Sequence, residues 1–112
     1  MKFYVCPVCG NVIITTEDNI VTCCGQKLNG QEIKIAEGKH RIIVEEKDGK
    51  VHFTSEHGMT KEHHLNFIAY GKNNQYMIIK LDKESSVDVI VERLEDADII
   101  FGCNQHGVWR NE

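Results

Sequence analysis

The chain has 112 residues, of which 41% are hydrophobic and 27% charged, and its formal net charge is -4. This length is enough for one ordinary hydrophobic core, or for a small metal-stabilised unit beside a somewhat larger domain. The composition is close to that of globular proteins and does not indicate a disordered chain. The acidic balance, without a run of basic residues among aromatics, argues against a nucleic-acid partner.

The N-terminus has no room for the apolar core of a signal peptide, because Cys6 follows only five residues. No apolar run of membrane-spanning length follows it. We therefore expect a cytoplasmic protein without a membrane partner. In that reducing compartment, the five cysteines are expected to bind metal rather than to form disulfides.

Four of the cysteines predict a metal-binding unit over residues 1–30, the first centre. They form two pairs, Cys6 with Cys9 and Cys23 with Cys24. Between the pairs lie apolar runs at 12–15 and 20–22 and a turn at 17–19, so we expect a hairpin whose two ends each offer two thiolates. Such a segment cannot bury a core of its own, so an ion would supply most of its folding energy. Four thiolates suit iron and zinc alike, and the alternatives are a pair of ordinary zinc-ribbon knuckles or a disulfide between the two adjacent cysteines.

Residues 31–112 are expected to form an immunoglobulin-like antiparallel β-sandwich, which makes the whole chain all-β. Short runs rich in Val, Ile, Thr, Phe and Tyr alternate with Gly, Asn and Asp. The expected strands are 33–36, 40–45, 51–54, 65–70, 76–81, 87–94 and 98–101. A tight hairpin turn is predicted at 47–50 and a slightly longer one at 71–74. Short strands with regular turns are typical of a sandwich.

Four histidines and the fifth cysteine are candidate ligands of a second metal centre. They are His40, His57, His63, His106 and Cys103. His57 and His63 would lie about 240° apart on a helix and about 20 Å apart on a straight strand. They can share a metal only if the segment doubles back as a loop, and Gly58 suits that because glycine can adopt positive φ.

The number and type of these ligands favour iron at the second centre. A zinc site is normally complete with four ligands, whereas five leave one open position on an octahedral iron. A cysteine ligand also pushes electron density through the metal toward a bound oxygen species. Blue copper pairs cysteine with histidine too, but no methionine follows His106. His52 and His64 are expected at the surface or in packing rather than among the ligands.

Together these motifs resemble the desulfoferrodoxins, the two-iron class of superoxide reductases, over nearly the whole chain. Cys-x2-Cys, followed by adjacent cysteines and Gly-Gln, resembles the desulforedoxin-like first centre of that family. Three further segments resemble the catalytic-iron motifs of the family and follow in the same order. They are Lys39-His40, His57-x5-His63 and Cys103-Asn104-x-His106-Gly107-x-Trp109.

The resemblance implies a role for each of these residues. The four histidines would be equatorial ligands of the catalytic iron, Cys103 would be axial, and the open position would receive superoxide for one-electron reduction to hydrogen peroxide. Lys39 would attract the anion and help to deliver a proton, and Lys61 could add to that field. The first centre, with iron or zinc, would relay electrons or stabilise the fold. A small donor such as rubredoxin would supply electrons to a homodimer.

The chain departs from the family pattern near Lys39. A glutamate commonly precedes this lysine, but here the position is Gly38, and Glu37 is one residue further away. We therefore expect no carboxylate on the oxidised iron. Gly58 replaces a usual proline, and Phe67 stands where a tryptophan is usual. The competing hypotheses are a non-catalytic iron electron-transfer or metal-binding module, and a zinc storage or delivery protein.

Overall fold

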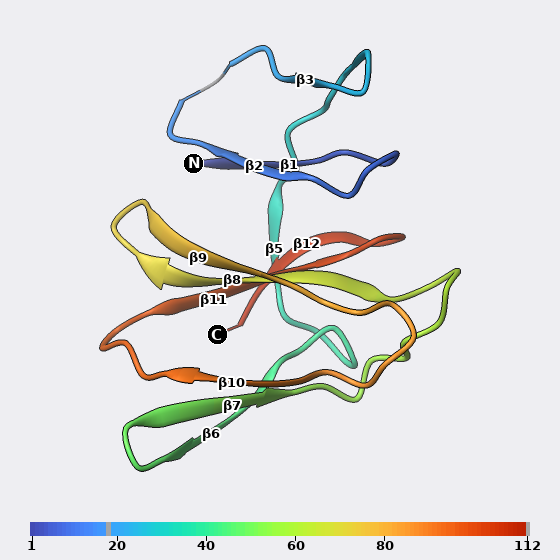
Figure 1. The fold of residues 1–112 in the computed structure, drawn as a ribbon. Helices are drawn as coiled ribbons and strands as arrows, with labels where there is room; N and C mark the ends of the chain where they lie inside the picture. Colours follow the sequence, from blue (N-terminus) through green and yellow to red (C-terminus); the bar gives the residue numbers. More distant parts are fainter. Residues whose placement is uncertain (18, 112) are drawn as a thin grey trace.

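The computed structural model describes residues 1–17 and 19–111, and it confirms the all-β expectation (Figure 1). No helix in this part of the chain is long and apolar enough to cross a membrane. The strands of these residues are β1 (Lys2–Val5), β2 (Val12–Thr15), β3 (Thr22–Cys23), β4 (Gln26–Lys27), β5 (Ile33–Ile35), β6 (Ile43–Lys47), β7 (Lys50–Thr54), β8 (Leu65–Lys72), β9 (Gln75–Lys80), β10 (Asp88–Glu92), β11 (Asp98–Cys103) and β12 (Gly107–Arg110).

The first 30 residues form two small sheets instead of the single hairpin expected between runs 12–15 and 20–22. β2 pairs with β1, a strand that was not predicted, and β3 pairs with β4. The expected pairing is wrong because Cys24 and Gly25 both have positive φ, 52° and 74°. Two such residues make a tight turn that folds β3 directly onto β4. Of the turn expected at 17–19, Asp18 lies outside the described residues.

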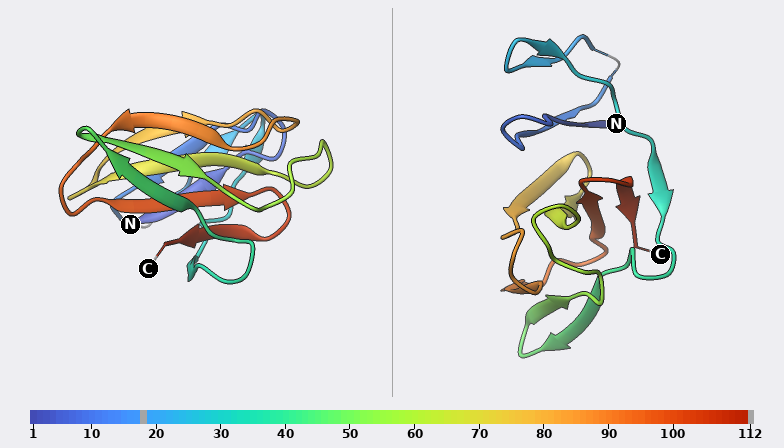
Figure 2. Two further views of the ribbon diagram at one scale, coloured as in Figure 1. Left: turned by 90° about the horizontal axis from the view of Figure 1, so that it is seen from below. Right: turned by 90° about the vertical axis from the view of Figure 1, so that its right-hand side faces the viewer.

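The remaining strands form the predicted sandwich. One sheet has the order β10-β7-β6 and the other β5-β12-β11-β8-β9. Figures 1 and 2 show the three-stranded sheet on one side of the five-stranded sheet and the N-terminal sheets on the other. Pairing within the sandwich is antiparallel except for β5 and β12, which are parallel. The strand β12, which was not predicted, thus pairs the C-terminal end of the chain with β5, the first strand of the sandwich.

Two local turn signals explain the hairpins of the sandwich. Asp48 and Gly49 link β6 to β7 with φ of 53° and 75°, and Asn73 and Asn74 link β8 to β9 with φ of 52° and 64°. Asn, Asp and Gly tolerate positive φ, and two consecutive residues of this kind match the twist of paired strands. The second turn is therefore as tight as the first.

The five-stranded sheet is buried on both faces. Along β8, Ile68 and Tyr70 point into the core between the two sheets, whereas Phe67 and Ala69 pack on the opposite face with Phe3. This alternation follows from the two-residue period of a strand. The core between the sheets also contains Cys103 and Trp109. The division into 1–30 and 31–112 stays a prediction.

Candidate metal centres

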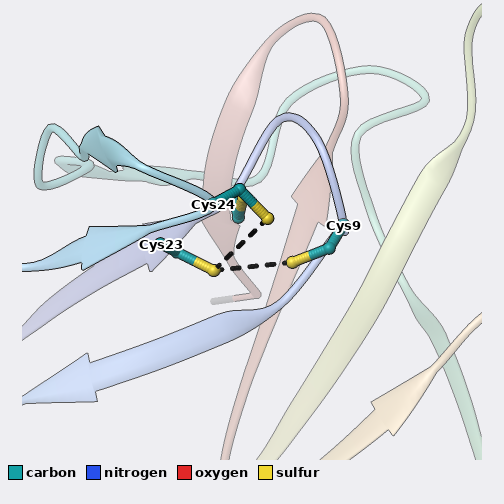
Figure 3. Close-up of side chains that lie close together, drawn as sticks. Cys9, Cys23 and Cys24 are labelled. Carbon is teal, nitrogen blue, oxygen red and sulfur yellow. Dashed lines mark hydrogen bonds between the residues drawn. The ribbon is translucent and has the colours of Figure 1, made fainter.

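The structure brings the four predicted cysteines of the first centre together. The sulfur atoms of Cys6, Cys9, Cys23 and Cys24 all lie within 4.8 Å of one another. After β1 the chain turns back at Gly10, whose N–H donates to the Cys6 carbonyl at 2.9 Å. Figure 3 shows the sulfur atoms of three of these cysteines facing one another. The sulfur atoms of Cys9 and Cys23 are 3.5 Å apart.

These cysteines are free thiols with unequal acidity. The Cys23 and Cys24 sulfurs are 3.9 Å apart, far beyond the roughly 2.05 Å of a disulfide, so the alternative of an adjacent disulfide is not formed. The backbone N–H of Cys9 is the main cause that lowers the pKa of Cys6 to about 6. Contacts with the sulfurs of Cys9 and Cys6 raise the pKa of Cys24 to about 12. Four adjacent thiolates repel one another, and a bound cation would remove that cost.

The second centre forms at one end of the sandwich. One ligand atom from each of His40, His57, His63 and Cys103 lies within 4.8 Å of the others. The Cys103 sulfur is 3.6 Å from Nε2 of His57 and also 3.6 Å from Nδ1 of His106. The His106 ring centroid is 4.9 Å from those of His40 and His63. All five predicted ligands therefore converge.

Three separate turns supply these ligands. Cys103 ends β11, and His106 lies in the turn before β12. His40 closes a tight turn in which its N–H donates to the Glu37 carbonyl at 2.9 Å and its own carbonyl accepts from the Glu37 N–H at 3.1 Å. The strands end at the same edge of the sandwich, so residues far apart in the sequence meet there.

The loop from His57 to His63 does double back, but Gly58 does not have positive φ, so that part of the expectation is wrong. The reversal is made by Thr60 instead. Its N–H donates to the His63 carbonyl at 3.0 Å, and its hydroxyl accepts from the His63 N–H at 3.1 Å. A side-chain turn of this kind satisfies the backbone without a glycine.

The histidine nitrogens fit a bound metal. Nε2 of His40 and of His63 is buried without a hydrogen-bond partner, which is costly for a polar atom unless something binds there. Nδ1 of His57 donates to the Gly58 carbonyl at 2.7 Å, and this leaves Nε2 as the unprotonated nitrogen facing Cys103. Nitrogen and sulfur donors of this kind bind iron and zinc.

Burial favours the neutral form of two of these imidazoles. It is the main cause that lowers the pKa of His40 and of His57, and the neighbouring histidines lower both further. For His57 the bond to the Gly58 carbonyl acts in the opposite direction. A neutral imidazole has the free electron pair that a metal requires.

A cavity of about 550 Å³ adjoins the second centre. It is lined by Glu37, Gly38, Lys39, His40, His57, Gly58, His63 and Trp109. Lys39 lines this cavity and is exposed, and its role stays a prediction. Lys61 lies elsewhere, with His64, on a larger cavity of about 920 Å³ between the N-terminal sheets and the sandwich.

The other histidines do not join the centre. Nδ1 of His64 donates to the Thr60 carbonyl at 2.8 Å, and His52 pairs with the Asp88 carboxylate on neighbouring strands. Trp109 is 7% exposed and stacks on His40, with ring centroids 4.4 Å apart and an angle of 7°. It is thus both a core residue and a neighbour of a ligand.

Two amide side chains between the last ligands hold the loops of the second centre together, and their roles were not predicted. Asn104 accepts from the His64 N–H at 2.9 Å and donates to the Glu62 carbonyl at 2.9 Å. Gln105 donates to the same carbonyl at 2.6 Å. The sequence signal that could have predicted this role is their position between Cys103 and His106, because amide side chains in a turn can form hydrogen bonds with the backbone of a neighbouring loop.

Comparison with solved structures finds the superoxide reductase from Treponema pallidum. It is 19% identical to this chain, with a TM-score of 0.79, over 99% of this chain and 97% of that one. No protein-family model and no curated protein matches the chain. The chain therefore has the fold of a superoxide reductase, and its four-cysteine cluster and histidine–cysteine site are consistent with a desulfoferrodoxin.

Proposed function

We propose that this protein is a superoxide reductase, in which superoxide takes up one electron and two protons to give hydrogen peroxide. The observation that carries the proposal is the convergence of four imidazoles and one thiol beside a cavity that Lys39 lines. The fold, shared with a superoxide reductase, supports it. No dioxygen is released in this reaction, which distinguishes it from dismutation.

The second centre is proposed to hold iron through His40, His57, His63, His106 and Cys103. Ferrous iron, when bound, supplies the electron. Cys103 is 4% exposed; it lines the larger cavity between the N-terminal sheets and the sandwich, and it is not among the residues that line the cavity beside Lys39. His40, His57 and His63 are among the residues that line that cavity. An anion that enters the cavity beside Lys39 therefore meets the histidine ligands and not Cys103.

Lys39 is proposed to attract the substrate. The chain carries a net charge of -4, so attraction of an anion has to be local. Among the described residues that line the cavity, Lys39 is the one lysine or arginine, and Glu37 opposes it. A lysine ammonium can also donate a proton, so Lys39 can supply one of the two protons and solvent the other.

The partners follow from the same proposal. A small electron donor such as rubredoxin would reduce the second centre, and the first centre would relay electrons or stabilise the N-terminal sheets with iron or zinc. The protein is proposed to act in the cytoplasm as a homodimer. Size-exclusion chromatography with light scattering tests the dimer, and the rate of reduction by purified rubredoxin tests the donor.

The decisive experiment combines metal analysis with a superoxide assay. We expect two metal ions per chain, at least one of them iron, and one hydrogen peroxide per superoxide consumed in the presence of a reductant. Dismutation would instead give half as much peroxide together with dioxygen. A chain that consumes no superoxide would overturn the proposal.

The competing hypotheses give different spectra. Azide or cyanide should perturb the absorption of an iron with an open position and leave a saturated electron-transfer site unchanged. A zinc storage or delivery protein would be colourless as purified.

A further inference from the structure

Lys34 contacts two parts of the second centre at once. Its Nζ donates a hydrogen bond to the carbonyl oxygen of His106 at 2.9 Å. The same ammonium lies 5.0 Å from the centroid of the Trp109 ring. Trp109 in turn stacks on His40, 4.4 Å between centroids and at an angle of 7°. One cation thus touches the backbone of one predicted ligand and the aromatic ring that packs against another.

The parallel pairing of β5 with β12 puts Lys34 in this place. In the register of the two strands, Lys34 lies opposite Trp109. Gly107 begins β12 with φ of 84°, a conformation that favours glycine and turns the chain from His106 into the strand. The side chain of Lys34 therefore reaches back along β12 to the last carbonyl of the ligand turn.

Trp109 depends on its neighbours for its position. Its ring nitrogen Nε1 is buried and has no hydrogen-bond partner among the described residues, so no hydrogen bond of its own fixes the indole. The ring is held by its packing in the core between the two sheets, by the stack with His40 and by the ammonium of Lys34. The face of an indole carries partial negative charge, so it attracts an ammonium placed over it.

We propose that Lys34 is a positioning residue of the second centre: it fixes the His106 turn and the Trp109–His40 stack, and its charge favours the reduced state of the bound metal. A positive charge beside a redox centre stabilises the less positive oxidation state. The redox part rests on the proposed function, because it needs iron at the site. The positioning part needs only a bound metal.

The test compares three variants of the full chain. Lys34→Met removes the ammonium and keeps an unbranched stem, and Lys34→Arg keeps the charge and can still donate and stack. Lys50→Met is the matched control, because Lys50 is an exposed lysine on the other sheet whose partner is Glu92, at 3.5 Å. Circular dichroism first establishes that each variant is folded.

Metal retention tests positioning. Each variant is loaded with Co²⁺, and release to a chelator is followed through the absorption band that Cys103→Ser abolishes. We expect Lys34→Met to bind the metal about tenfold more weakly, as is typical when a group behind a ligand is lost, and Lys34→Arg to recover most of that loss. Equal retention in Lys34→Met and Lys50→Met would overturn the positioning role.

The reduction potential of the iron-loaded protein tests the charge. At a fixed applied potential we expect the ratio of reduced to oxidised centre to fall about threefold in Lys34→Met, a shift of about 30 mV at 59 mV per tenfold. The difference from wild type should shrink between 0.01 M and 1 M salt, because the Debye length falls from about 30 Å to about 3 Å. A shift that is absent or independent of salt would overturn the electrostatic role. If the wild type fails to reduce superoxide while Lys34→Met still loses metal faster, the proposed function fails and the positioning role stands.

Discussion

Phe3 and Phe67 stack with ring centroids 5.9 Å apart and an angle of 14° between their planes, and both side chains are fully buried. Phe3 belongs to β1 and Phe67 to β8, so this contact joins the N-terminal sheets to the five-stranded sheet. Ala69, Ile100 and Val108 complete the same cluster. The first 30 residues therefore gain stability from the sandwich as well as from any metal that they bind.

Replacing Phe3 should destabilise the metal-free protein strongly. Phe3→Ala removes a buried ring and leaves a cavity, for which the usual cost is about 3–5 kcal/mol in the free energy of unfolding. Urea unfolding measures it. Ile20→Ala is the control: its side chain is 80% exposed, and surface changes usually stay within about 0.5 kcal/mol. A cost for Phe3→Ala no larger than that of the control would mean that β1 does not pack on the sheet in solution.

Removing one thiolate of the first centre should separate the two metal sites. Cys9→Ser is expected to lower the metal content by one ion per chain, because a four-thiolate site loses a ligand, and to spare most superoxide reduction. Elemental analysis and the superoxide assay measure the two effects, with Cys103→Ser as the reciprocal variant. If Cys9→Ser and Cys103→Ser lost turnover equally, the first centre would be an obligatory electron relay.

The strand pairings that could be predicted from the sequence are those with a local signal. The turns at Asp48-Gly49 and Asn73-Asn74 consist of residue types that tolerate positive φ, so two adjacent residues are enough to predict each hairpin. β1 and its pairing with β2 have no such signal. They depend on Phe3 meeting Phe67, a contact between distant residues that no local pattern carries.

The residues that converge as candidate ligands were predictable because histidine and cysteine are few and chemically distinctive, but the scaffold around them was not. The reversal between His57 and His63 was assigned to Gly58, whereas the hydroxyl of Thr60 makes it. The contact of Lys34 with the His106 carbonyl exists only because β5 lies parallel to β12. Such contacts follow from tertiary packing, which spacing along the chain does not encode.

Acid should destabilise the metal-free protein through His40 and His57. Burial lowers the pKa of both in the folded state, so below pH 6.5, the ordinary value, the unfolded chain binds more protons than the folded one. The stability gained from the neutral imidazoles is present above pH 6.5 and is lost as the pH falls through the folded-state pKa. Urea unfolding between pH 7.5 and 5 should show this decline.

Two variants locate the origin of the acid effect. His57→Gln replaces a buried imidazole by a neutral side chain and should reduce the decline. His52→Gln should not reduce it, because His52 lies on the other sheet beside Asp88, away from the second centre. An identical decline in both variants would place the titrating groups elsewhere.

Cys103→Ser should abolish superoxide reduction and leave the fold largely intact. The substitution exchanges one sulfur for oxygen at a residue that is 4% exposed, within a core formed by many other side chains. The absorption band from thiolate to iron should disappear with the activity, while circular dichroism stays unchanged. Retained turnover in a protein that still binds iron would contradict the role of this thiolate.

Lys39 and Lys61 form a matched pair for testing attraction of the anion. Lys39 lines the cavity that His40, His57 and His63 also line, whereas Lys61 lines the larger cavity between the N-terminal sheets and the sandwich, and both are exposed lysines. Lys39→Met should lower the rate constant for superoxide by about tenfold or more, the lower end of local electrostatic steering, and should weaken its salt dependence. Lys61→Met should stay close to wild type. Stopped-flow kinetics at several ionic strengths measures both rates, and equal losses would mean that the overall charge of the chain, rather than the cavity, guides the anion.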